Sequence, residues 1–93
     1  MAKIKVNTVE ALKQSMLING FLQTSDEIYE WEDGVIVVRL MEKSTSPIVY
    51  ISVHKSNIPL RHNNRIYRLD SAGIRKANHL FLLLINTIEG REQ

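Results

Sequence analysis

The residues best suited to binding chemistry lie together between positions 54 and 76. This stretch holds six of the chain's twelve lysine and arginine residues and one acidic residue, Asp70. Arginine suits phosphate oxygens because its planar guanidinium donates two parallel hydrogen bonds. We therefore predict a binding surface for nucleic acid or another partner made of Lys55, Arg61, Arg65, Arg68, Arg75 and Lys76. The alternative interpretation is that these charges are solvated or paired with acidic residues elsewhere.

Two of these residues, Arg75 and Lys76, fall in the first turn of a predicted C-terminal helix. A cation at that position opposes the positive end of the helix dipole. A bound anion would relieve the conflict, because helix N-termini attract phosphate groups. Asp70, just before the helix, weakens this interpretation.

The opposite charge is concentrated in residues 26–33, which contain five acidic residues and no basic one: Asp26, Glu27, Glu30, Glu32 and Asp33. Such acids commonly act as solvated charges that protect a strand edge. A second interpretation is a stripe that imitates a phosphate row and occupies a partner's nucleic-acid groove. The separation of charge indicates a molecule with two electrostatic faces, unless the segments neutralise each other within one copy or between copies.

The three histidines, His54, His62 and His79, are not spaced as metal ligands, and the chain has no cysteine. We therefore expect no metal and no cofactor. His54 and His62 lie beside arginines, so an acid–base pair for RNA cleavage remains an alternative. The chain contains no Walker loop, G-x-G-x-x-G, G-x-S-x-G or H-E-x-x-H motif, and we predict no enzyme activity.

The length of 93 residues predicts a single domain, residues 1–93. The start, MAKIKVNT, lacks the apolar stretch of a secretory signal. The longest apolar run, LFLLLI at 80–85, is shorter than the roughly 20 residues that span a bilayer. We expect a soluble, cytoplasmic protein without a membrane partner.

Local signals predict the first helix and a hairpin. Asn7 is predicted to be the N-cap of the first helix, because Glu10 three residues later completes a capping box. This helix is expected to run to about Asn19 and to end with Gly20 in a Schellman motif. The Asp33-Gly34 pair between two β-rich runs predicts a two-residue hairpin turn. Its register places Trp31 opposite Ile36, Tyr29 opposite Val38 and Glu27 opposite Leu40.

Two further strands and a helix complete the chain. Residues 48–55 predict a strand with Val49, Ile51 and Val53 facing the core, and residues 65–69 predict a short edge strand. The last helix is expected at 71–89, capped by Asp70 or Ser71 and ending at Gly90. Its apolar stripe is too broad for one sheet to cover, so Leu82 and Leu83 lie either under another segment or at a subunit or partner interface.

The predicted fold is α+β with two layers: an N-terminal helix, an antiparallel meander of three to four strands and a C-terminal helix, with both helices on one face. This order resembles the double-stranded-RNA-binding fold, which small HicA-type toxin ribonucleases share. The resemblance implies phosphate contacts near Arg75 and Lys76. The glycine–serine–histidine signature of such toxins is absent from the first hairpin, which reads Trp31-Glu32-Asp33-Gly34, and no family is assigned.

The leading functional hypothesis is a small non-enzymatic binding protein, a regulator or inhibitor of the phage or mobile-element type. It would act on nucleic acid or on a nucleic-acid-processing protein, with a homodimer as one possible state. The alternatives are a toxin-like ribonuclease on a double-stranded-RNA-binding-like fold and a structural or chaperone-like dimer.

Overall fold

The structure is a computed structural model, and it describes residues 6–54 and 65–90. Along the chain, one helix precedes the five strands and the other follows them. The elements are α1 (Val9–Ile18), β1 (Leu22–Gln23), β2 (Ile28–Trp31), β3 (Ile36–Met41), β4 (Ile48–Val53), β5 (Arg65–Arg68) and α2 (Ser71–Glu89). Within the described ranges, neither helix is long and apolar enough to cross a membrane.

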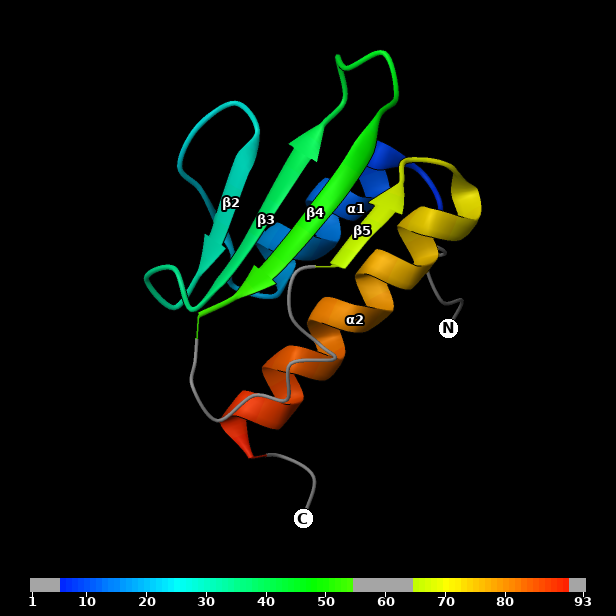
Figure 1. Cartoon of the computed structure of the whole chain (residues 1–93). Helices are drawn as coiled ribbons and strands as arrows, with labels where there is room; N and C mark the ends of the chain where they lie inside the picture. Colours follow the sequence, from blue (N-terminus) through cyan, green and yellow to red (C-terminus); the bar gives the residue numbers. More distant parts are fainter. Residues whose placement is uncertain (1–5, 55–64, 91–93) are drawn as a thin grey trace.

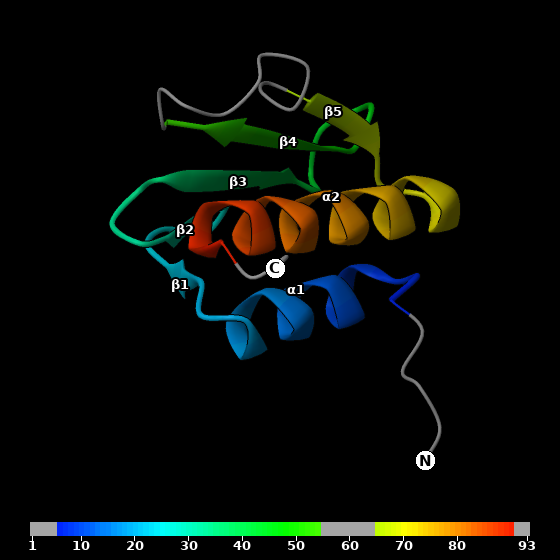
Figure 2. The same cartoon turned by 90° about the horizontal axis from the view of Figure 1, so that it is seen from below.

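The strands form one antiparallel sheet in which each pairs with its neighbours in sequence, in the order β1-β2-β3-β4-β5 (Figure 1). Both helices lie on the same face of this sheet (Figure 2). The two-layer α+β prediction is confirmed, and β5 is an edge strand as expected. The predicted number of strands was too low. The missed strand, β1, has only two residues, which is too short to show an alternating pattern.

The start of α1 differs from the prediction by one residue. Thr8, not Asn7, is the N-cap, and its hydroxyl accepts a hydrogen bond of 3.1 Å from the Ala11 N–H. Both residue types can cap, and the extended backbone of Thr8 places its oxygen beside the free amide three residues later. This shift leaves Glu10 one position short of a capping box.

The end of α1 is the predicted Schellman motif. Gly20 has a positive φ of 97°, which a residue without a Cβ adopts freely. The Phe21 N–H donates to the Met16 carbonyl at 3.0 Å, and the Gly20 N–H donates to the Leu17 carbonyl at 3.2 Å. This turn buries Phe21 in the core.

The β2–β3 hairpin has the predicted register, with Trp31 opposite Ile36 and Tyr29 opposite Val38. The Leu40 N–H also donates to the Glu27 carbonyl at 2.8 Å, which continues the pairing. Asp33 and Gly34 both have positive φ, at 56° and 92°, as a primed two-residue turn requires. The predicted buried face is confirmed by the burial of Tyr29, Trp31, Ile36, Val38 and Leu40.

The core lies between the sheet and the helices. It joins the inward residues of the sheet to Leu12 and Met16 of α1 and to the apolar stripe of α2. Phe21 meets Phe81 edge to face, with ring centroids 5.2 Å apart. The stripe runs as predicted through Ile74, Ala77, Leu80, Phe81, Leu84, Ile85 and the half-buried Ile88.

Polar contacts also tie α1 to its neighbours. The Ser15 hydroxyl is hydrogen-bonded to Asn78 of α2. The Lys13 ammonium lies 2.8 Å from the Glu42 carboxylate at the end of β3. This hydrogen bond raises the pKa of Lys13 above its ordinary value of 10.5, and burial raises the pKa of the neighbouring Tyr29 above 10.0.

The start of α2 is held close to the end of β5. Asp70 is the N-cap, and its carboxylate accepts a hydrogen bond of 2.7 Å from the Gly73 N–H. At Gly73 the helix comes so near to β5 that an added Cβ would lie 1.9 Å from the Arg68 carbonyl oxygen. Only glycine fits there without moving one backbone away from the other.

We expect Gly73→Ala to destabilise the protein, although alanine favours helix over glycine by about 1 kcal/mol. The clash with the Arg68 carbonyl forces α2 away from β5, and overpacking of this kind costs roughly 1–3 kcal/mol. Denaturant unfolding with Ala72→Gly as a control measures the effect, because Ala72 is exposed and loses only helix propensity. A Gly73→Ala protein more stable than wild type would contradict the close approach.

Loss of the N-cap is expected to have a smaller effect. Asp70→Ala removes the acceptor for the Gly73 N–H and should lower the free energy of unfolding by about 1 kcal/mol. Asp70→Ser retains a capping oxygen and should recover most of this loss when all three proteins are compared by denaturant unfolding. Equal stability of the alanine and serine variants would argue against a capping role.

Candidate functional site

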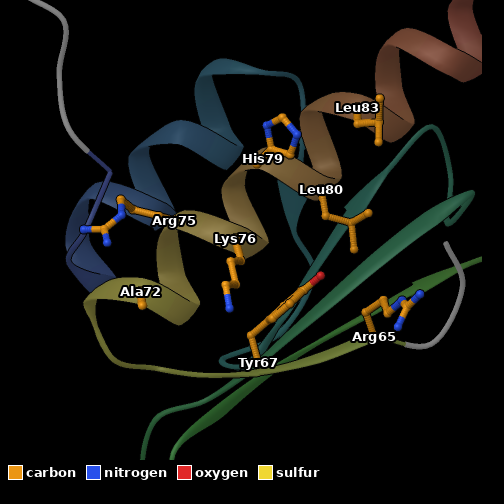
Figure 3. Close-up of a pocket in the computed structure, with 8 residues that line it drawn as sticks. All are labelled: Arg65, Tyr67, Ala72, Arg75, Lys76, His79, Leu80 and Leu83. Atoms are coloured by element: carbon orange, nitrogen blue, oxygen red, sulfur yellow. The ribbon is translucent and has the colours of Figure 1, made fainter. Parts of the chain in front are cut away.

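A groove of about 430 Å³ lies between the edge strand β5 and the exposed side of α2. Side chains from both elements surround it (Figure 3). The residues that line it are Arg65, Tyr67, Ala72, Arg75, Lys76, His79, Leu80 and Leu83.

Strand alternation brings two of these residues to the groove. Arg65 pairs with Ile51 and Tyr67 pairs with Val49. Ile51 and Val49 are fully buried on the helix side of the sheet, so Arg65 and Tyr67 also belong to that side. At the edge strand this side is open enough to leave Tyr67 half-buried.

Helical spacing brings the remaining residues together. Ala72, Lys76, His79 and Leu83 follow one another at intervals of three or four residues, which places them on one side of α2. Lys76 and Leu80 project from the helix toward Tyr67 (Figure 3). The groove therefore has an apolar base with cations around it.

The predicted basic residues divide into three groups. Arg65, Arg75 and Lys76 line the groove together. Arg68 lies three residues after Arg65 on the same strand and so belongs to its other face, in a separate hollow formed with Ser46, Pro47, Leu69 and Asp70. Lys55 and Arg61 lie outside the described residues.

The positive charge of the groove is only partly balanced by acidic residues in the described part of the chain. Arg75 donates a hydrogen bond of 3.0 Å to the Ser71 hydroxyl. Within residues 6–54 and 65–90, neither Arg75 nor Lys76 forms an ion pair. The ion pair made by the acidic segment joins Glu27 to Arg39 of the neighbouring strand at 3.4 Å. In the described part of the chain, the acids of 26–33 thus do not neutralise these two cations.

The expectation of an anion at the start of α2 needs correction. The Asp70 carboxylate already accepts the Gly73 N–H and places a negative charge against the helix dipole. Arg75 and Lys76 are the fifth and sixth residues of α2, so they lie in its second turn and not in the predicted first turn, where the helix dipole acts most strongly.

The remaining acidic residues lie toward the other edge of the sheet. Glu30, Glu32 and Asp33 border a hollow of about 310 Å³ with Gly20, Leu22 and Thr24. Leu22 and, at the end of α1, Leu17 and Ile18 are exposed apolar residues. The strand order separates this acidic side, near β1 and β2, from the basic groove at β5.

The histidines have different environments. His54 follows β4 and its Nε2 lies 3.2 Å from the Ser52 hydroxyl, on the sheet face opposite the helices. Ser52 alternates with the core-facing Ile51 and Val53 and so lies on that opposite face, yet it is buried, at 6% exposure. His62 lies outside the described residues, while His79 lines the groove.

Leu82 and Leu83, which the sequence placed at the edge of the apolar stripe of α2, have different environments in the structure. Leu82 is half-buried and packs against the core, whereas Leu83 is 40% exposed and borders the groove. They therefore do not form one apolar patch. The 100° step between successive helical residues separates them across the margin of the core.

Sequence reasoning missed Tyr67, Ala72, His79 and Leu80 as groove residues. The available signal was spacing: Tyr67 is two residues from Arg65 on a strand, and His79 and Leu80 are one helical turn from Lys76. No match was found when the chain was compared with protein-family models, curated proteins and solved structures.

Proposed function

We propose that this protein is a non-enzymatic regulator that binds nucleic acid in the groove between β5 and α2. The observation that supports the proposal is that Arg65 from the strand and Arg75 and Lys76 from the helix line one groove, with Lys76 projecting toward Tyr67 (Figure 3). Cations gathered in this way bind a phosphate backbone largely by releasing its condensed counterions.

The composition of the groove favours nucleic acid over a protein partner. The buried centres of protein–protein interfaces are depleted in lysine, whereas Lys76 projects toward the centre of this groove. Interfaces with nucleic acid are more polar and much more positively charged. Tyr67 and His79 add groups that hydrogen-bond to phosphates, sugars or base edges.

Removal of Arg75 and Lys76, which form no ion pair within residues 6–54 and 65–90, should weaken binding and reduce its dependence on salt. We expect Arg75→Ala/Lys76→Ala to lower oligonucleotide affinity roughly tenfold or more at low salt, because two phosphate contacts are lost. The slope of log K against log salt should become shallower by about 0.7–0.9 per lost contact. Fluorescence anisotropy with a labelled oligonucleotide across a salt series measures both quantities.

The matched control is Lys43→Ala/Arg68→Ala, which also removes one lysine and one arginine. Both residues are exposed, and neither lines the groove. The control should retain nearly wild-type affinity. If both double variants lose affinity equally, the attraction comes from net charge and the groove is not the binding surface.

The same mixtures test the non-enzymatic part of the proposal. Labelled RNA incubated with pure protein should remain intact when analysed on a denaturing gel. Cleavage that is lost in His54→Ala would instead identify the protein as a ribonuclease, and cleavage lost only in His79→Ala would place that chemistry in the groove.

A further inference from the structure

The base of the groove is more apolar than phosphate binding requires. Leu80 and Tyr67 form its interior, and Leu83 stands at its margin with 40% of its surface exposed. An exposed leucine among cations gains nothing from a phosphate or a ribose hydroxyl. Its burial is favourable only against another apolar surface.

Duplex and single-stranded nucleic acids differ in whether they offer an apolar surface to Leu83. A duplex stacks its bases inside and presents sugars and phosphates to a groove on a small protein. A single strand exposes the faces of unstacked bases, which proteins bind on apolar and aromatic side chains beside a positively charged track. The groove, with a volume of about 430 Å³, is an open surface hollow and not an enclosed cavity.

We propose that the groove selects single-stranded nucleic acid and holds one unstacked base against Leu83, Leu80 and Tyr67. The phosphates on either side of that base then lie along Lys76 and Arg75 on the helix and toward Arg65 on the strand. This inference rests on the proposed nucleic-acid binding, and it adds the class of nucleic acid and the residues that select it.

The groove geometry supports this division of roles. Lys76 projects toward Tyr67, whereas Arg75 extends away from the strand along the helix (Figure 3). Lys76 therefore reaches the Tyr67 end of the apolar base, whereas Arg75 leaves that base uncovered. Leu83 lies two helical turns beyond Lys76, so a base seated on it leaves its phosphate within reach of the helix cations.

The test compares a labelled single strand of about a dozen nucleotides, within the usual site size of small binding folds, with a duplex of the same sequence at equal salt. We expect the single strand to bind about tenfold more tightly or better. Leu83→Ser should weaken single-strand binding roughly fivefold or more, as loss of a base contact does, and leave duplex binding unchanged.

Ile66→Ser is the matched control. Ile66 is 58% exposed, but it occupies the face of β5 opposite Arg65 and Tyr67 and does not line the groove. Its substitution should leave single-strand affinity unchanged. Thermal unfolding of both serine variants establishes that they are folded, and the exposure of both side chains predicts small changes in stability.

The outcomes distinguish this inference from the proposed function. Equal affinity for single strand and duplex, or an unchanged affinity in Leu83→Ser, overturns the inference and leaves nucleic-acid binding intact. Absence of binding to either form overturns both. A wild-type dimer in light scattering that Leu83→Ser converts to a monomer assigns Leu83 to a subunit interface and also overturns the inference.

Discussion

The groove exists because the backbone of α2 touches the backbone of β5 at Gly73. Only Leu69 and Asp70 separate the last residue of β5 from the first residue of α2, so the chain has little freedom to swing the helix outward. The Leu69 N–H donates to the Pro47 carbonyl, and Asp70 caps the helix. Because Gly73 has no Cβ, α2 can pack directly against β5. In this position Lys76 and Leu80 project toward Tyr67.

This placement concentrates like charges in a way that does not favour folding. Arg65, Arg75 and Lys76 share one groove, and two of them are consecutive residues in the second turn of α2. Asp70 offsets part of that cost, while the buried core between sheet and helices supplies the stability that tolerates it. A bound polyanion removes the remaining repulsion, so ligand binding and folding stability are expected to be linked.

The predictable features were those governed by fixed spacing along the chain. The hairpin register follows from a two-residue turn, and both glycine helix ends follow from the need for a left-handed residue. Prediction of the groove residues required more than spacing between helix and turn signals, because it depends on which face of β5 each residue occupies. Arg65 and Arg68 were grouped by charge, yet an interval of three places two strand residues on opposite faces. Thr8 is the N-cap although asparagine is intrinsically the stronger capping residue, so capping preference alone predicted the wrong one of these two neighbours.

The sheet order gives the charge separation its physical meaning. Because every strand pairs with its sequence neighbour, the acidic hairpin near β1 and β2 and the basic groove at β5 lie toward opposite edges. The intervening strands keep the two groups apart, so the described residues carry a charge dipole across the sheet although the net charge of the chain is only +2. In the field of a polyanion such a dipole turns the basic edge toward the ligand and the acidic edge away. For the proposed nucleic-acid ligand, orientation during approach then follows from the order of the strands, before any side chain in the groove makes contact.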